Sequence, residues 1–218
     1  MSFRDKIGKE LMFFDGGMGT LLQERGLKAG EVPETWNLLH PEIIQQIHKE
    51  YLLAGSNVVS ANTFGVNVFK CKDLAYSVDE LVGAGVRLVK NAMDEVRVQE
   101  NGKTHAMYCA LDIGSLGKLL KPLGEISFDE AYEAFREIAM AGERAGADLI
   151  LIETVSDSYE IKAAVLAAKE NTNLPVVVTM IFDEGGKLLT GGDGAQVTNN
   201  YTELKTTTAT KDALQQVQ

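Results

Sequence analysis

The sequence predicts an α/β protein: a (β/α)8 barrel of the TIM type, incomplete, with about five βα units and an atypical C-terminal tail. Three observations lead to this prediction. Short apolar runs alternate with longer amphipathic stretches, the runs show no polar alternation, and the first strand–helix turn lacks a dinucleotide-binding pattern. The length of 218 residues and the 45% hydrophobic content suit one compact domain or most of a larger one.

Five short apolar runs are the expected strands. Because polar residues do not alternate within them, they are typical of parallel strands in a sheet that is covered on both faces. The runs are Leu11–Phe14, Asn57–Ala61, Ala106–Asp112, Asp148–Glu153 and Val176–Phe182.

Amphipathic stretches between these runs are the expected helices, and most have recognisable ends. One begins at Pro41, a residue that suits a first helical position, and stops at Gly55. Another opens with the capping box Ser127-x-x-Glu130 and continues to about Gly146. A further helix follows the fourth apolar run and leads into the fifth.

The stretch 78–98 is the longest expected helix. The capping box Ser77-x-x-Glu80 opens it. Gly83 and Gly85 lie in its first turns, where each weakens a helix by about 1 kcal/mol relative to alanine. Strands and helices therefore alternate along the chain with no internal break.

Two architectures accept this alternation: an open doubly wound sheet and a (β/α)8 barrel. The first strand–helix turn, DGGMGT at residues 15–20, distinguishes them. Leu22 stands where the third glycine of the dinucleotide fingerprint would lie, which argues against a dinucleotide site. The sequence therefore favours the barrel.

The sequence changes character after Gly191. Polar residues and threonines predominate there, and no buried strand is visible. We therefore divide the chain into a partial barrel at residues 1–193 and a polar tail at residues 194–218. Three of eight barrel strands are then missing, and an unclosed sheet has two free edges, so we expect the chain to self-associate through them.

Charge and composition limit the class of partner. Twenty-one Lys+Arg against 31 Asp+Glu give a formal net charge of −10, which excludes the electrostatic footprint of a nucleic-acid or anionic-membrane binder. No apolar run approaches the roughly 20 residues of a membrane span, and the N-terminus shows no signal-peptide core. With only Cys71 and Cys109, far apart, the composition predicts a cytoplasmic protein that binds a small molecule or another protein.

Ligand-binding groups of a barrel come from the C-terminal ends of its strands, so polar residues there are the candidates. Asp15 follows the first run, and Glu153 closes the fourth. A buried carboxylate needs a partner, and the ammonium group of a ligand would provide one. Structural roles stay open: Asp15 could cap the first loop, and Asn62 and Thr63 could be turn and cap residues.

Four sequence blocks near the expected strand ends carry a family resemblance. They are FFDGGMGTLLQERG, HPEIIQQIHKEYLLAGSNVVSANTFG, LDIGSLGKLLKPLG and GADLILIETVSDSYEIKAAVLAAKE, followed by LTGGD near residue 190. In this order, over about residues 10 to 193, the chain resembles the homocysteine S-methyltransferase family, in particular the homocysteine-binding module of its cobalamin-dependent branch. The resemblance implies a TIM barrel that binds homocysteine at its strand ends. It also implies methyl transfer to the homocysteine thiol, which forms methionine.

The resemblance also implies substrate-binding roles for particular residues. Asp15 and Glu153 would engage the ammonium group of homocysteine. Backbone groups at Gly16 and Gly17, together with the Thr63 region, would hold the substrate around its carboxylate and side chain.

The implied chemistry depends on zinc, which deprotonates the substrate thiol. In this family three cysteines hold the metal, one in a G-x-N-C segment and two in a Gly-Gly-Cys-Cys pair. Neither motif occurs here, and Cys71 and Cys109 match neither position. We therefore assign no catalytic and no metal-binding residue to this chain, and expect it to supply the homocysteine-binding part only. Methylcobalamin and methyltetrahydrofolate are implied on other modules, while betaine or S-methylmethionine as methyl donor stays open.

Two further hypotheses belong to other classes. A non-catalytic homocysteine-binding fragment, or an assembly subunit, would bind substrate without zinc and without turnover. An unrelated barrel enzyme acting on a phosphorylated sugar or acid would need a phosphate-binding loop near the last strands. Binding of homocysteine, compared with a phosphorylated metabolite, separates these hypotheses.

Overall fold

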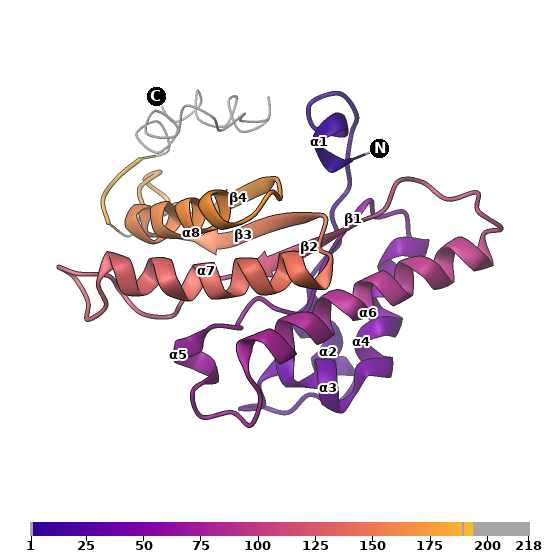
Figure 1. The fold of residues 1–218 in the computed structure, drawn as a ribbon, viewed down its shortest axis with the longest axis horizontal. Coiled ribbons are helices and arrows are strands. Elements are labelled where there is room, and N and C mark those ends of the chain that lie inside the picture. Colours follow the sequence, from indigo (N-terminus) through magenta and orange to yellow (C-terminus); the bar gives the residue numbers. More distant parts are fainter. Residues whose placement is uncertain (1, 189, 194–218) are drawn as a thin grey trace.

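The computed structural model describes residues 2–188 and 190–193, which form an α/β fold around one parallel sheet (Figure 1). The four described strands lie in the order β1-β2-β3-β4, so each pairs with the next one along the chain. They are β1 (Val58–Ser60), β2 (Tyr108–Ile113), β3 (Leu149–Val155) and β4 (Val176–Met180). The described helices are α1 (Phe3–Lys6), α2 (Met18–Glu24), η1 (Pro33–Thr35, a 3-10 turn), α3 (Trp36–Leu39), α4 (Pro41–Leu53), α5 (Val68–Cys71), α6 (Val78–Gln99), α7 (Phe128–Ala145) and α8 (Ser158–Asn171).

The last four expected strands are confirmed as β1 to β4, whereas the first is wrong. The run Leu11–Phe14 contributes only an isolated parallel bridge, between Phe14 and Val58. The side chain of Asn57 accepts the Phe13 N–H at 3.0 Å, which diverts that group from a regular backbone ladder. Phe13 is also 58% exposed, so burial of its side chain does not stabilise this segment as a strand.

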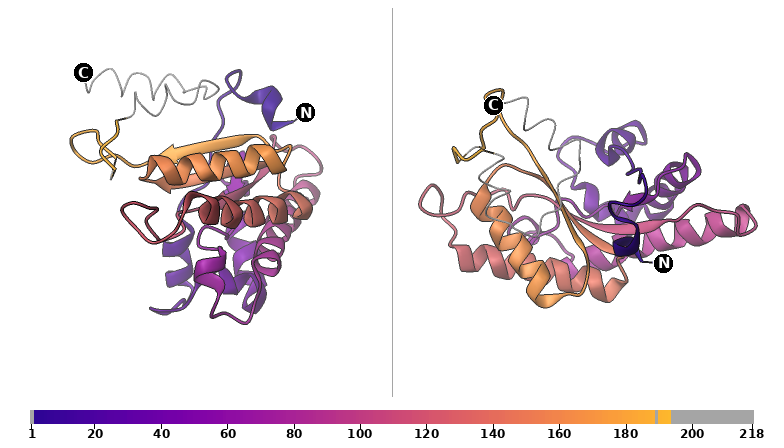
Figure 2. Two further views of the ribbon diagram at one scale, coloured as in Figure 1. Left: turned by 60° about the vertical axis from the view of Figure 1, so that its left-hand side comes forward. Right: turned by 90° about the horizontal axis from the view of Figure 1, so that it is seen from above.

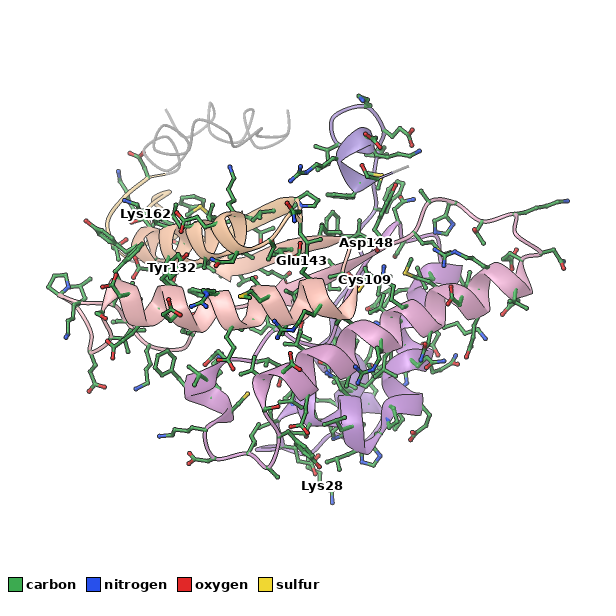
Figure 3. All side chains as sticks on the ribbon, viewed as in Figure 1. Lys28, Cys109, Tyr132, Glu143, Asp148 and Lys162 are labelled. Atoms are coloured by element: carbon green, nitrogen blue, oxygen red, sulfur yellow. The ribbon has the colours of Figure 1, made fainter. Side chains whose placement is uncertain are left out.

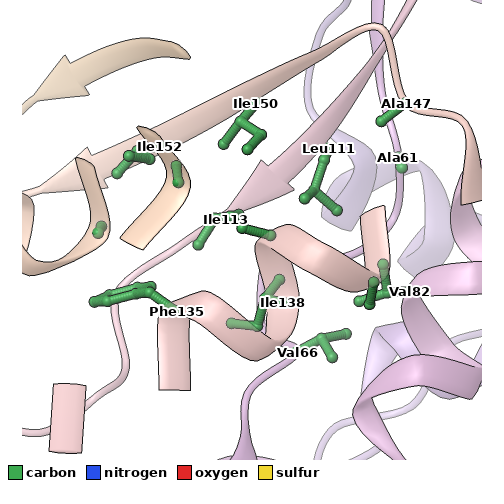
Figure 4. Packing of buried hydrophobic residues seen from close by; sticks show 14 of the residues in the cluster. Ala61, Val66, Val82, Leu111, Ile113, Phe135, Ile138, Ala147, Ile150 and Ile152 are labelled. Atoms are coloured by element: carbon green, nitrogen blue, oxygen red, sulfur yellow. The ribbon is translucent and has the colours of Figure 1, made fainter. Parts of the chain in front are cut away.

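The two faces of the sheet are covered unequally. Successive side chains of a strand point to opposite faces, and one set faces the helices. The right panel of Figure 2 shows α7 and α8 lying along that face. Strand residues such as Leu111 and Ile150 pack there against Phe135 and Ile138 of α7 in the largest apolar cluster (Figure 4).

The opposite face carries a smaller apolar cluster, to which α1 contributes. Phe3 is 4% exposed and meets the ring of Tyr108 edge to face, with 5.4 Å between the ring centroids. Val58, Ala110 and Leu149 on this face are fully buried. Both faces of β1, β2 and β3 are therefore covered, as expected. Helices α6 to α8 cover one face, and α1 packs on the other.

The helix ends follow the local signals in the sequence. Both capping boxes are present: the Ser77 hydroxyl accepts the Glu80 N–H, and Ser127 does the same for Glu130, each at 3.2 Å. Helix α7 ends at Gly146, whose φ of 93° lies in the left-handed region that favours glycine. None of the described helices is long and apolar enough to cross a membrane.

Gly83 and Gly85 of α6 differ in the space around them. A Cβ at Gly83 would lie 3.0 Å from the mobile end of Arg87, whereas one at Gly85 would lie 2.9 Å from both Asn37 Nδ2 and Thr63 Cγ2. Gly85 therefore lets α6 approach the segment that follows β1.

We expect Gly83→Ala to raise the free energy of unfolding by about 1 kcal/mol, because alanine is the better helix former and Arg87 can move aside. Gly85→Ala gains the same helix propensity but overpacks a buried contact, which costs roughly 1–3 kcal/mol, so it should lower stability by up to about 2 kcal/mol. Urea denaturation of both variants measures the difference. Equal stabilisation by both would contradict the close contact at Gly85.

Candidate functional site

Carboxyl groups gather at the C-terminal ends of the strands, on the face opposite to α6, α7 and α8. Ser60 pairs in register with Ala110, and Asp112 pairs with Leu151, two residues before Glu153. Since every second residue of a strand shares a face, these polar side chains lie above the apolar cluster of α1 and Tyr108. We call the group the carboxyl layer; it consists of Asp15, Ser60, Asp112 and Glu153.

Asp15 is held in the layer by β1. Its Oδ2 accepts the Ser60 N–H at 2.9 Å, and its Oδ1 accepts the Ser60 hydroxyl at 3.0 Å. Burial raises the pKa of Asp15 to about 6, the bonds from Ser60 oppose this shift, and the charge of Glu153 adds to it. Asp15 and Glu153 therefore lie close enough for their charges to interact, and the substrate role predicted for both stays a prediction. A cation beside Asp15 would favour its charged form.

The pKa of Asp15 has a consequence for stability. Because the folded-state pKa of about 6 lies above the ordinary 3.8, the stability linked to Asp15 is full below pH 3.8 and is lost as the pH rises through 6. Asp15→Asn removes this loss while keeping an acceptor for the Ser60 N–H. We expect the variant to be more stable than the native chain at pH 7.5, by on the order of 1–3 kcal/mol, and unchanged near pH 3.5. Thermal unfolding at both pH values checks this, and a pH-independent difference would contradict it.

Asp112 and Glu153 lie on neighbouring strands of the layer. Asp112 is 6% exposed, and its Oδ1 has no hydrogen-bond partner. Burial and the neighbouring carboxyl group of Glu153 raise the pKa of Asp112 well above its ordinary range. No substrate role was predicted for Asp112 from the sequence, although Asp112 ends an expected strand just as Glu153 does.

The backbone of β3 is irregular at Glu153. The register with β4 shifts between Ile152 and Val155, and Thr154 has a φ of 61°, which is rare for a β-branched residue. The hydroxyl of Thr179 on β4 accepts the Thr154 N–H at 3.0 Å. Irregularities of this kind redirect side chains at strand ends, and here Glu153 stays partly exposed beside the buried Asp112.

Thr63 lies beneath the carboxyl layer. Its side chain is fully buried, and its hydroxyl donates to the backbone carbonyl of Asp112 at 2.7 Å. Asn62 beside it donates to the Pro33 carbonyl and to Asn37 Oδ1. The structure therefore gives the Thr63 side chain a structural contact to β2, and the predicted substrate role of this region stays a prediction.

Gly16 and Gly17 lie where the chain turns from Asp15 into α2. A Cβ at Gly16 would lie 2.9 Å from the Tyr51 hydroxyl, which donates to the Gly17 carbonyl at 3.2 Å. This close approach explains the need for glycine at residue 16. The backbone role predicted for both glycines toward a substrate stays a prediction.

Glu34 is a further carboxyl group near the layer that sequence reasoning missed. It is 5% exposed in η1, and its Oε1 accepts the Gly65 N–H at 2.5 Å. Its charge adds to the raised pKa of Asp112. Nothing in the local sequence of η1 signals this contact, because it forms across 31 residues of chain.

The cysteines do not fit a zinc site in this part of the protein. Cys109 lies near the start of β2, fully buried on the helix side, and its backbone N–H bonds to Asp148 (Figure 3). Burial raises the pKa of the Cys109 thiol to about 12. Cys71 lies in α5 and is also buried. Within residues 2–188 and 190–193, no three His, Cys, Asp or Glu side chains are placed to hold a metal.

Comparison with protein families gives the class of this chain. The profile described as Homocysteine S-methyltransferase matches residues 12–210, which is most of the sequence. The chain belongs to the homocysteine S-methyltransferase family, as the sequence blocks predicted. The match continues past residue 193, while the predicted division there involves residues 194–218, which lie outside those that the structure describes.

Two curated relatives are similar over nearly the whole chain. It is 29% identical over 204 residues to "Methionine synthase" of Mycobacterium leprae (strain TN), a match that covers 87% of this chain. It is 30% identical over 210 residues to "Methionine synthase" of Mycobacterium tuberculosis (strain ATCC 25618 / H37Rv), covering 89% of this chain. The matches take up 16% and 17% of those proteins, so the chain spans about a sixth of their length.

Solved structures show the same fold. The homocysteine methyltransferase MmuM from Escherichia coli, in its oxidized form, matches with a TM-score of 0.80 and 19% identity, over 93% of this chain and 72% of that chain. Its metallated form matches with a TM-score of 0.78 and 20% identity, over 90% and 72%. The four parallel strands and their helices thus correspond to the larger part of a homocysteine methyltransferase fold.

Proposed function

We propose that this chain is the homocysteine-binding part of a system that transfers a methyl group to the homocysteine thiol and forms methionine. The observation that carries the proposal is the convergence of Asp15, Asp112 and Glu153 at one end of the sheet. Family membership and the similarity to proteins named methionine synthase support the choice of substrate and reaction.

The carboxyl layer suits the ammonium end of an amino acid. Burial makes an unpaired carboxylate costly, and an ammonium ion supplies both the opposite charge and further hydrogen-bond donors. Asp15 and Glu153 would take the ammonium group, while Gly16, Gly17 and the Thr63 region would border the rest of the substrate. Fixing one end of homocysteine in this way orients its thiol for reaction with a methyl donor.

We further propose that β1 to β4 are part of a (β/α)8 barrel, and that the five βα units expected from the sequence reduce to these four strands and the bridge at Phe14. The fold likeness to MmuM, which extends over 72% of that protein, supports this. In a barrel, the carboxyl layer lies at the end where ligands bind.

Zinc, methylcobalamin and methyltetrahydrofolate belong to the proposed reaction as partners held elsewhere. This chain matches only about a sixth of each methionine synthase, which supports the proposal that other modules bind the metal and the methyl donor. A non-catalytic homocysteine-binding fragment or assembly subunit is the second candidate, and the buried, separated positions of Cys71 and Cys109 favour it. The two candidates share homocysteine binding and differ in turnover.

Calorimetric titration of the full chain with homocysteine tests the shared part of the proposal. We expect saturable binding of homocysteine and none of a phosphorylated metabolite such as glycerol phosphate; the reverse would overturn it. Elemental analysis of zinc after mild chelation then separates the candidates. Bound zinc and turnover with a methyl donor would exclude the non-catalytic fragment, and the absence of both would favour it.

Self-association through the sheet edge follows from the proposed incomplete barrel. Among the described strands, β4 pairs only with β3, and Ile181 next to its end is 49% exposed. We expect light scattering coupled to gel filtration to show a mass above one chain of 23.7 kDa that rises with concentration. A sharp monomer peak with cooperative unfolding at high temperature would contradict this expectation.

A further inference from the structure

Glu160 is a buried carboxyl group in the first turn of α8, outside the carboxyl layer. Its side chain belongs to a residue that is only 4% exposed. Its Oε1 accepts the Leu116 N–H at 2.7 Å, and the Ser115 hydroxyl donates to its two oxygens at 3.0 and 3.2 Å. Because a buried carboxylate is costly unless it is hydrogen-bonded, these bonds account for its place inside the protein. They also tie α8 to the loop that follows β2.

The position of Glu160 in its helix suits a different contact. It stands three residues after the N-cap Asp157, as Glu80 of α6 and Glu130 of α7 stand after theirs. Those two glutamates turn back to the N-cap N–H and complete capping boxes. The carboxylate of Glu160 instead binds the loop around Leu116, 44 residues away along the chain. Glu160 therefore serves the loop.

The loop that Glu160 holds lies between two strand ends of the candidate site. Leu116 follows Asp112 by four residues, and Asp157, which precedes α8, follows Glu153 by four. The bond from Leu116 to Glu160 therefore connects the segment after β2 with the segment after β3.

The segment after β1 is bonded to the same loop. The Gly114 N–H donates to the Phe64 carbonyl at 3.0 Å, and Lys70 Nζ donates to the Ser115 carbonyl at 2.8 Å. A Cβ at Gly114 would lie 2.6 Å from the Phe64 ring, so the two segments approach closely. Residues 114–116 therefore bridge the segments that follow β1 and β3.

We propose that Glu160 is a positioning residue, which holds the loop at residues 114–116 against α8 and so keeps the ends of β2 and β3 in the arrangement that binds the substrate ammonium group. Asp112 and Glu153 lie at those two ends. A recognition group binds well only when its support holds it in place. The inference rests on the proposed function, since it deepens the recognition of homocysteine at the same site.

Removal of the acceptor at residue 160 tests this role. Glu160→Ala loses the bonds to the loop, so we expect homocysteine affinity to fall about tenfold, because the loop must then be ordered when the substrate binds. Glu160→Gln keeps a carbonyl acceptor for the Leu116 N–H, so its affinity should stay within about threefold of the native value. An affinity of the Gln variant as low as that of the Ala variant would overturn the inference.

Glu143→Ala is the matched control. Glu143 Oε1 also accepts a backbone N–H at 2.7 Å, from Asn173, which precedes β4 at the other end of the sheet. This variant loses the same kind of bond away from the strand ends of the site, so its affinity for homocysteine should equal that of the native chain.

A second substitution separates positioning from stability. Gly83→Ala, which we expect to stabilise α6, should raise the melting temperature of Glu160→Ala and leave its homocysteine affinity low. Recovery of affinity together with stability would overturn the inference, because Glu160 would then act through stability alone. Native-like affinity in Glu160→Ala itself would overturn it as well.

Amide hydrogen exchange provides a readout without ligand. The Leu116 N–H should exchange slowly in the native chain and in Glu160→Gln, and faster in Glu160→Ala; equal exchange in all three would overturn the inference. If Glu160→Ala fails to fold, Ser115→Ala replaces it, since it removes the hydroxyl bonds and leaves the Leu116 N–H bond. We expect a loss of affinity of about threefold or more there, and no loss would overturn the inference. If the native chain does not bind homocysteine, the proposed function fails, and the positioning role falls with it.

Discussion

Glu153→Gln is expected to weaken homocysteine binding by about 10- to 100-fold, or roughly 1.5–3 kcal/mol. The substitution keeps the shape of the side chain and removes the charge that pairs with the substrate ammonium group. Glu153 is partly exposed at the irregular end of β3, whereas Asp112 beside it is buried, so Glu153 is the carboxylate within reach of a ligand. Calorimetry at pH 7.5 measures the change in the dissociation constant.

Glu100→Gln, on the exposed residue that follows α6, is the matched control for the same change in charge. It should leave the affinity for homocysteine unaltered. Unchanged affinity in Glu153→Gln, with binding by the native chain intact, would remove Glu153 from the site. The pH dependence is a second check, since loss of the Asp15 proton near pH 6 should strengthen native binding between pH 5 and 7.

Phe135→Ala is expected to lower the free energy of unfolding by about 3–5 kcal/mol. Phe135 is 1% exposed on α7, within the apolar cluster that joins the helices to β2 and β3 (Figure 4). Truncation leaves a cavity beneath the strands that carry Asp112 and Glu153. Denaturation with urea, followed by circular dichroism, measures the loss.

Val98→Ala near the end of α6 is the control for Phe135→Ala, because Val98 is 78% exposed and should change stability by less than about 0.5 kcal/mol. Saturating homocysteine should raise the melting temperature of Phe135→Ala, since a ligand that binds only the folded state stabilises it. Homocysteine at the same concentration should raise the melting temperature of Glu153→Gln much less. A loss below 1 kcal/mol in Phe135→Ala would contradict the tight packing of this cluster.

The parts of the fold that the sequence predicts well are those with local causes. Capping boxes at Ser77 and Ser127 involve residues three apart, and β2 to β4 are apolar runs long enough to recognise. The run Leu11–Phe14 has the same composition but forms only a bridge, because Asn57, 44 residues away, takes the Phe13 N–H. A contact between residues this far apart cannot be recognised from a short window of sequence.

The same distinction applies to the site. Asp15 and Glu153 are recognisable as carboxylates at the ends of apolar runs, and the structure brings them together. The partnership of Asp112 with Glu153 depends on the register of β2 with β3, and the contact of Glu34 with Gly65 depends on how η1 packs. Burial of Thr63 is likewise a tertiary effect, which explains why its side chain bonds to β2 beneath the layer.

Calorimetric titration of the full chain with homocysteine and, in parallel, with 4-mercaptobutanoic acid shows directly whether the carboxyl layer recognises an ammonium group. The second compound keeps the thiol, the carboxylate and the chain length and lacks only the ammonium group. If the carboxyl layer of Asp15, Asp112 and Glu153 recognises that group, homocysteine binds and the analogue binds at least tenfold more weakly. Equal binding of the two compounds, or binding of the analogue alone, would contradict the account.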